Sequence, residues 1–148
     1  MNAKVPMRMR DKVLLRVASK VFIPLILLFA LYVQFHGDFG PGGGFQAGVI
    51  FSAGFVLFGL IFGLDALRQV LPLSIVERGV ALGLLLYGGV GLACLLRGGR
   101  FLDYAVLDHH NAVHGQHLGI LLIELGVGLT VAASMLAIFY AMAGRGRA

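Results

Sequence analysis

Four long apolar segments follow one another along the chain, separated by short polar stretches. They cover residues 21–35, 39–64, 79–96 and 118–144, and the first extends backwards through 13–17. Each segment is uncharged or nearly so, and each approaches the length of about 20 residues that a helix needs to cross a bilayer. The short alternating segments of a membrane β-barrel are not found. We therefore predict an all-α, polytopic membrane protein with four transmembrane helices, at about 13–35, 45–64, 76–96 and 118–143.

The composition supports this prediction. Of the 148 residues, 59% are hydrophobic and 13% are charged, with a mean hydropathy of +0.91. A soluble domain carries about 25% charged residues, so this chain has too little polar surface for a compact monomer in water. The length allows one membrane domain, residues 1–148. A pI of about 9.9 does not indicate nucleic acid, because half of the basic residues lie in the first twenty positions, beside an apolar segment.

Basic residues also predict the orientation. With four spans, both termini and the loop after the second span lie on one side of the membrane. That side holds ten basic residues: Lys4, Arg8, Arg10, Lys12, Arg16, Lys20, Arg68, Arg78, Arg145 and Arg147. The opposite side holds two, Arg97 and Arg100. Positive residues remain on the cytoplasmic side, so we predict that both termini are cytoplasmic.

Glycines recur at the spacing that lets helix backbones approach closely. The pairs are Gly44 and Gly48, Gly59 and Gly63, Gly79 and Gly83, and Gly115 and Gly119. Packing among the protein's own helices would explain them. Because there are 22 glycines in so small a protein, we expect a share of them to face other subunits.

Glu124 is an acidic residue within the fourth apolar segment. It lies seven residues, or about 10 Å of helix, past His117. A carboxylate at membrane depth must be protonated, paired, or facing water or protein, and is functional by default. We interpret Glu124 as a proton-exchanging or cation-attracting group. A neutral glutamic acid that only fixes helix packing is the alternative.

Histidines precede Glu124 in the segment DHHNAVHGQHLG. His110, His114 and His117 are spaced to share one face of a helix, and Glu124 is nearly aligned with His117. Histidine titrates near neutral pH, so such a line is able to pass protons towards Glu124. Zinc is a weaker interpretation, because only Asp103, Asp108 or His109 offers a further ligand. An interfacial loop whose histidines bond to neighbouring chains is the other alternative. We predict no metal and no cofactor.

The stretch HGDFGPGGGFQAG, residues 36–48, joins the first two spans. It contains His36, Asp38 and Gln46 as further candidates for an ion route. It is not a phosphate-binding loop, since GxxxxGK[ST] is absent. Pro41 and the glycines after it favour a broken helix start that packs against a partner and borders an ion route. Neither a nucleophile–base pair nor a cofactor fingerprint is found, which argues against an enzyme.

Two stretches, HGDFGPGGGFQAGVIFSA and HGQHLGILLIELGVGLTVA, resemble the B subunit of the Mrp (Mnh) multisubunit Na⁺/H⁺ antiporters. The resemblance covers nearly the whole chain. It implies a small multi-pass subunit of a hetero-oligomer in the bacterial cell membrane, with other subunits, lipid, monovalent cations and protons as its partners. Its motif residues here are Pro41, Gly42, Gly43, Gly44, Phe45 and Gln46, then His114, Gly115, Gly119 and Glu124.

Several functions remain open on the sequence alone. The first is an antiporter subunit whose polar residues line a cation or proton route. The second is a scaffold that assembles larger subunits through glycine faces such as those of Gly48 and Gly83. A related setting is a membrane subunit of an ion-pumping hydrogenase. An independent small channel ranks last, because a lone chain would leave its close-packing faces exposed.

Overall fold

A computed structural model describes residues 13–37, 40–108 and 110–145. Every regular element in these ranges is helical. The elements in chain order are α1 (Val13–His36), α2 (Gly44–Phe62), α3 (Leu64–Val70), α4 (Leu73–Leu96), the short 3₁₀ helix η2 (Tyr104–Leu107) and α5 (Ala112–Gly144). The N-terminal basic residues up to Lys12, together with Asp38, His109 and Arg147, lie outside the described residues.

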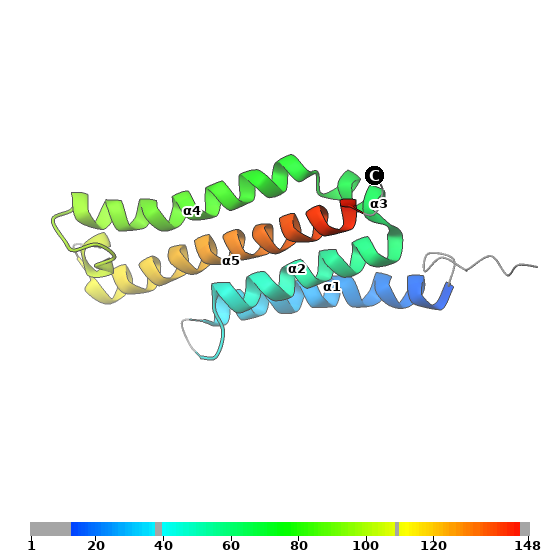
Figure 1. The fold of residues 1–148 in the computed structure, drawn as a ribbon. Coiled ribbons are helices and arrows are strands. Elements are labelled where there is room, and N and C mark those ends of the chain that lie inside the picture. Colours follow the sequence, from blue (N-terminus) through cyan, green and yellow to red (C-terminus); the bar gives the residue numbers. More distant parts are fainter. Residues whose placement is uncertain (1–12, 38–39, 109, 146–148) are drawn as a thin grey trace, which may run out of the picture.

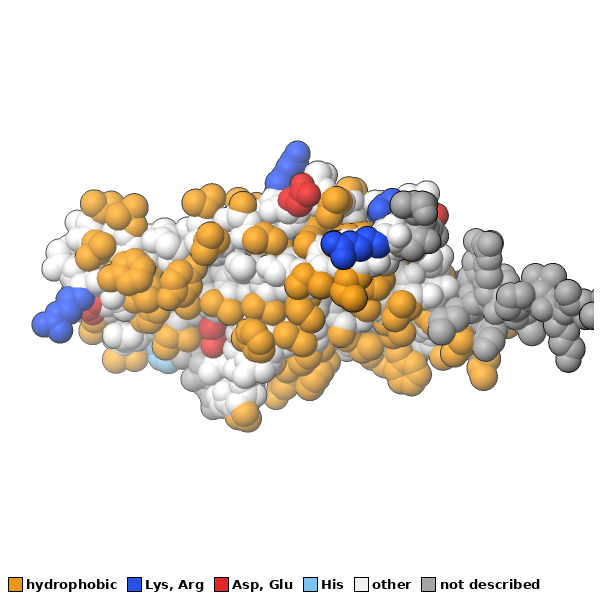
Figure 2. All heavy atoms as spheres, viewed as in Figure 1, with side chains coloured by type: hydrophobic (Ala, Val, Ile, Leu, Met, Phe, Trp, Pro, Cys, Tyr) orange, Lys and Arg blue, Asp and Glu red, His pale blue; other side chains and the backbone are white. Residues whose placement is uncertain are grey.

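Four helices, α1, α2, α4 and α5, are long and apolar enough to cross a membrane. This confirms the predicted all-α architecture with four spans. Hydrophobic side chains dominate the face seen in Figure 2. Many large ones are exposed, including Leu14, Leu85 and Leu96, as expected for surfaces that meet lipid or other membrane subunits. The described start of α1 and the end of α5 lie at the same end of the bundle (Figure 1).

Helix α5 begins at Ala112, six residues before the predicted position of 118. Asn111 is the cause, because its side chain accepts hydrogen bonds from the backbone N–H groups of Val113 (3.0 Å) and His114 (3.3 Å). Helix α4 begins at Leu73, directly after Pro72, a position that suits proline. Both helices thus begin a few residues before the positions that hydropathy alone predicted.

Helix α5 is the central element of the bundle. It packs on α4 along one side and on α2 along the other, while α1 packs mainly on α2 (Figure 1). The long α5 therefore touches every other long helix, and its sequence contributes to both main interfaces. This position brings Glu124 of α5 against the start of α2 and against the loop between α1 and α2.

Glycines form the tight contacts of α5 with α2 and α4. A Cβ atom at Gly44 would overlap the carbonyl oxygen of Glu124, and one at Gly48 would lie 2.6 Å from the carbonyl oxygen of Gly128. On the other side, a Cβ atom at Gly83 would lie 2.6 Å from the carbonyl oxygen of Gly126. These glycines pack the chain against itself. We expected a share of the glycines to face other subunits; Gly44, Gly48 and Gly83 instead have backbone of this chain in the space beside them.

A buried hydrophobic cluster closes the end of the bundle where α3 lies. It consists of Leu64, Leu67, Val76, Ala133, Leu136 and Tyr140. The Tyr140 hydroxyl donates a hydrogen bond of 2.6 Å to the carbonyl oxygen of Leu71. A buried phenol needs such a partner. The cluster is therefore apolar, and the hydroxyl of its one tyrosine has a hydrogen-bond acceptor.

Candidate functional site

The loop between α1 and α2 folds back on the end of α1. The N–H of Gly43 donates to the carbonyl oxygen of Val33 (3.1 Å), and the N–H of Gly40 donates to that of His36 (3.1 Å). Gly43 has φ +120°, a backbone conformation that residues other than glycine rarely adopt. Helix α2 begins at Gly44, three residues after Pro41, so Pro41 belongs to the loop and not to the helix entry itself.

Glu124 lies directly against this loop. Its carboxylate is so close to Gly37 that a Cβ atom there would overlap it, and a Cβ atom at Gly43 would lie 3.2 Å from its Oε1. The backbone of Glu124 fills the space beside Gly44. Three glycines thus surround the one acidic residue of α5. The two sequence motifs, far apart along the chain, meet at this place.

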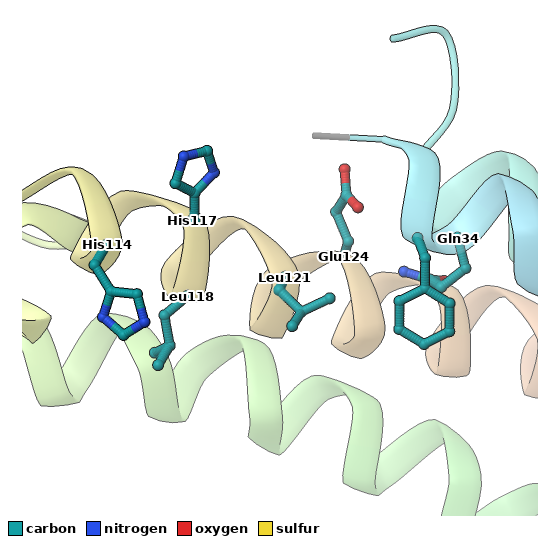
Figure 3. A pocket seen from close by; sticks show the side chains of 7 residues that line it. Gln34, His114, His117, Leu118, Leu121 and Glu124 are labelled. Atoms are coloured by element: carbon teal, nitrogen blue, oxygen red, sulfur yellow. The ribbon is translucent and has the colours of Figure 1, made fainter. Parts of the chain in front are cut away.

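An open cleft of about 450 Å³ lies beside Glu124. Its walls come from the end of α1 and the first half of α5, and Figure 3 shows the side chains that form them. The lining residues are Gln34, Phe35, His114, His117, Leu118, Leu121 and Glu124. Polar groups and leucines alternate along it, so the cleft presents a carboxylate, imidazoles and an amide within an otherwise apolar surface.

Two of the three predicted histidines reach the cleft. His117 projects to the same side of α5 as Glu124, while His114 projects to another side (Figure 3). His110 was predicted on the same helix face, and that alignment is wrong. Helix α5 begins only at Ala112, so His110 precedes it, is exposed and is not among the residues that line the cleft.

Asp108 orients His114. Its Oδ2 lies 2.8 Å from Nδ1 of His114, and its Oδ1 accepts hydrogen bonds from the N–H groups of His110 (2.9 Å) and Asn111 (3.3 Å). These hydrogen bonds, that of the His110 N–H first, lower the pKa of the Asp108 carboxyl. The carboxylate therefore holds the entry to α5 and one imidazole at the mouth of the cleft.

The remaining candidates from the first loop lie outside the cleft lining. His36 stacks on the ring of Tyr32, with centroids 5.1 Å apart. Gln46 and Phe45 are exposed on the first turn of α2. Asp38 lies outside the described residues. A Cβ atom at Gly42 would lie 2.7 Å from the carbonyl oxygen of Val33, so Gly42 allows the loop to pack on α1.

Gly115 and Gly119, predicted for assembly, hold the second loop of this chain. The ring of Tyr104 in η2 lies on Gly119, and a Cβ atom at Gly115 would lie 2.6 Å from the carbonyl oxygen of Tyr104. Burial raises the pKa of the Tyr104 phenol above its usual value. These two glycines thus let η2 cover the start of α5.

Gln34 is a member of the cleft that the sequence analysis did not identify. It is the only amide in residues 21–35, and this polar residue in an apolar run is the signal that could have found it. Its side chain is buried, 6% exposed. Across the described residues, no group of three or more His, Cys, Asp or Glu side chains has an arrangement that could hold a metal ion.

Residues 14–137 match a family model described as "Domain related to MnhB subunit of Na+/H+ antiporter". The match covers both α2 with its preceding loop and the Glu124 region of α5. The chain belongs to the MnhB family. This confirms the resemblance to the B subunit of the Mrp (Mnh) antiporters that the two sequence stretches indicated.

Curated relatives of this MnhB-family chain carry names in agreement with that result. The chain is 32% identical over 136 residues to "Putative antiporter subunit mnhB2" of Staphylococcus haemolyticus, covering 90% of this chain and 96% of the relative. It is 30% identical over 130 residues to the B subunit of the Na(+)/H(+) antiporter of Bacillus subtilis, covering 82% and 90%. It is also 30% identical over 136 residues to "Putative antiporter subunit mnhB2" of Staphylococcus aureus strain Newman, covering 90% and 96%.

Proposed function

We propose that the chain is a small membrane subunit of a multisubunit Na⁺/H⁺ antiporter in the bacterial cell membrane, and that the Glu124 cleft borders its cation or proton route. The observation that carries the proposal is the position of Glu124. This residue belongs to α5, a helix long and apolar enough to span the membrane, and its side chain lines an open cleft. The names of the relatives support the antiporter setting over a hydrogenase. In this role the chain acts in transport and not as an enzyme.

Glu124 has the surroundings that an exchanging carboxylate needs. An acidic group at membrane depth is costly unless it faces water, a cation or a hydrogen-bonding partner. The cleft has space for water. The loop beside the Glu124 carboxylate presents glycine backbone to it and no large side chain from Gly37 or Gly43. Irregular backbone at membrane depth is tolerated only when it is buried in protein or lines a water-filled cavity, and Gly43, at the end of this loop, is buried.

His117 and His114 supply titrating groups beside the same cleft. An imidazole has one ring nitrogen that donates and one that accepts a hydrogen bond, so these side chains are suited to passing protons between the cleft and its mouth. His110, His36, Asp38 and Gln46 remain predicted neighbours of the route. We propose that both termini are cytoplasmic, which places the histidines and the first loop on the outer side.

Other subunits of the antiporter are the expected partners of the exposed apolar faces. The scaffold role through Gly48 and Gly83 loses its motivation, because both glycines already pack inside the chain. Among the described residues, no atom of another element lies within 4 Å of where a Cβ of Gly88 or Gly89 of α4 would be, so α4 keeps a smooth surface of its own. Assembly and transport are therefore assigned to different parts of the molecule.

The test is Na⁺/H⁺ exchange in membrane vesicles that contain the assembled complex. Glu124→Gln keeps the size of the side chain and removes its charge, and we expect it to lower exchange at least about tenfold. Glu77→Gln is the matched control, because Glu77 is the only other glutamate of the chain and lies exposed at the start of α4. Unchanged exchange in an assembled Glu124→Gln complex would refute the route.

A further inference from the structure

The Asp108 carboxylate is held in place from both sides along the chain. Before it, Nη1 of Arg97 donates hydrogen bonds to the carbonyl oxygens of Val106 (3.5 Å) and Leu107, at the end of η2. After it, two backbone N–H groups of the turn that leads into α5 donate to Oδ1 of Asp108, at 2.9 Å and 3.3 Å. With Oδ1 engaged by the backbone, Oδ2 is the oxygen that meets the side chain of His114.

The contact between Asp108 and His114 has the geometry of a strong hydrogen bond. Oδ2 lies 2.8 Å from Nδ1 of the imidazole, a length typical of a hydrogen bond to an ionised group. His114 lies in the first turn of α5 and lines the cleft together with His117 and Glu124. One nitrogen of a cleft-lining imidazole is thus engaged by a carboxylate outside the cleft lining.

The direction of this hydrogen bond follows from the charge of Asp108. The hydrogen bonds from the His110 N–H and from His114, the first having the larger effect, lower the pKa of the Asp108 carboxyl, so this group is ionised at neutral pH. An ionised carboxylate accepts hydrogen bonds and has no hydrogen to donate. Nδ1 of His114 is therefore the donor. In a neutral imidazole the other nitrogen is then an acceptor, so Nε2 has the free lone pair.

Nδ1 keeps its hydrogen whether the His114 ring is neutral or charged. When the neutral ring binds a proton, the lone pair of Nε2 forms the new N–H bond and the ring becomes an imidazolium, with a hydrogen on both nitrogens. When the proton leaves, it leaves from Nε2, because loss from Nδ1 would break the hydrogen bond to Asp108. The ring therefore does not pass a proton from one nitrogen to the other.

We infer that Asp108 is a positioning residue that holds His114 as the Nδ1–H tautomer, and that His114 exchanges protons with the cleft through Nε2 alone. The inference rests on the proposed function, in which the cleft borders a proton route. Within that route, His114 takes up a proton at the mouth of the cleft and returns it from the same atom.

A contact that only closes the turn before α5 is the alternative. The His114 side chain is 65% exposed and that of Asp108 is 28% exposed, and ion pairs this exposed contribute little to stability. The turn has hydrogen bonds of its own, those to Oδ1 of Asp108 and those to the Asn111 side chain. The contact of Oδ2 with the imidazole adds little to the turn, whereas it determines which ring nitrogen carries the hydrogen.

Other titratable and charged groups belong to the elements around His114. They are His36 at the end of α1, Arg97 and Arg100 next to the end of α4, Asp103 and Tyr104 where η2 begins, and His110, His117 and Glu124 along the last segment. Asp38 and His109 lie outside the described residues. The charges of these groups change how readily the ring takes up a proton. The nitrogen that keeps its hydrogen is set by the contact with Asp108.

The experiment is NMR of the full chain, labelled with ¹³C and ¹⁵N at its histidines and reconstituted in lipid bilayers. Protonated and unprotonated ring nitrogens resonate at well-separated frequencies, and the signals that vanish in His114→Gln belong to His114. At about pH 8, where an ordinary imidazole is neutral, we expect a protonated Nδ1 and an unprotonated Nε2. At about pH 5, where an ordinary imidazole is charged, Nε2 alone should have changed, by gaining a hydrogen.

Asp108→Asn keeps the size of the side chain and reverses the hydrogen bond. Its amide oxygen replaces Oδ1 opposite the two backbone N–H groups, so its NH₂ group replaces Oδ2 and faces Nδ1 of His114. Nδ1 must then accept, as when an amide replaces the carboxylate behind a catalytic histidine. We expect the tautomer to invert to Nε2–H, with the ratio of the two forms changing at least about tenfold. Asp103→Asn is the matched control at the other end of η2, where Asp103 makes no side-chain cap, and it should leave the tautomer unchanged.

An unprotonated Nδ1 in the wild type at either pH would overturn the inference, and this measurement decides even if Asp108→Asn does not fold. An Asp108→Asn chain that folds and keeps the wild-type tautomer would overturn it as well, since that is the result expected if Asp108 only closes the turn. Unchanged exchange in Glu124→Gln would refute the route alone, because the NMR signals report on the ring and not on transport.

Discussion

The two ends of the bundle solve the problem of buried polar groups in opposite ways. At the α3 end, the cluster around Leu67 is apolar, and its one phenol, Tyr140, donates to the carbonyl oxygen of Leu71. At the other end, Glu124 and the unpartnered amide of Gln34 line an open cleft. One helix, α5, contributes to both ends.

The difference separates stability from chemistry. A satisfied apolar cluster holds α3, α4 and α5 together and requires nothing from outside the chain. The cleft end keeps a carboxylate on the wall of an open cleft and a buried amide nitrogen without a partner among the described residues, at the expense of stability. Glycine contacts along the bundle let α5 approach α2 and α4 closely. The same helix therefore contributes to the apolar cluster at one end and to the cleft at the other.

The largest effect is expected from disturbing the backbone contact between α2 and α5 at the cleft end. In Gly44→Ala the new Cβ atom meets the backbone of Glu124, which cannot move aside, so we expect a loss of stability of at least about 3 kcal/mol. The thermal midpoint of the detergent-purified protein measures it. Gly89→Ala is the control: nothing lies near its Cβ position, and alanine should stabilise the helix by about 0.5–1 kcal/mol. Equal stability of the two variants would contradict the close backbone packing.

A second change disturbs only the cleft end. In Gly37→Ala the new Cβ atom meets the Glu124 carboxylate, the far end of a flexible side chain, which is displaced while the fold persists. We expect Na⁺/H⁺ exchange of the complex to fall on the order of tenfold, because function depends on placement of the reacting group. In the same loop, the new Cβ atom of Gly40→Ala meets, among the described residues, only the His36 ring, at 3.2 Å, and this variant should retain exchange. Normal exchange in Gly37→Ala would show that transport does not depend on the position of the Glu124 carboxylate.

A third change disturbs only the closed end. Tyr140→Phe removes the donor to the Leu71 carbonyl, and we expect a loss of about 1 kcal/mol of stability with exchange unchanged. Unfolding in detergent, followed by circular dichroism, gives the stability. Tyr32→Phe, at an exposed tyrosine of α1, should have no comparable effect. A Tyr140→Phe complex with impaired exchange would show that the two ends are coupled.

The smallest effect is expected at the mouth of the cleft. Asp108→Ala removes the acceptor for the N–H groups of His110 and Asn111, so hydrogen exchange of these amides should accelerate. Because folding lowers the pKa of Asp108, its contribution is present above the ordinary carboxyl pKa and is lost as pH falls through the lowered value. The difference from wild type should therefore vanish only in strong acid. Asp103→Ala is the control, since Asp103 makes no side-chain cap on η2, and should leave these amides unchanged.

Hydropathy located the four long helices, because a bilayer requires apolar surface over a fixed length. It placed their ends less well. The start of α5 depends on the Asn111 side chain, which contributes through two hydrogen bonds rather than through hydrophobicity. His110 was wrongly aligned with His114 for this reason.

Glycine spacing predicted close helix contacts correctly but did not identify the contacting partner. The spacing of Gly48 and Gly83 agrees equally well with contacts to other subunits and with contacts inside the chain, since spacing describes one helix and not its neighbour. The tertiary structure showed that α5 lies against both.

By itself, the sequence determined the fold class, the family and the presence of a single glutamate within the fourth apolar segment, because these depend on composition and on local motifs. Only the tertiary structure brought Glu124 of α5 against Gly37 and Gly43 of the first loop. It also turned Gln34 from an inconspicuous polar residue into a wall of the same cleft. The physical reason is that both contacts join segments some ninety residues apart in sequence, and their distance is set by backbone packing that no local pattern contains.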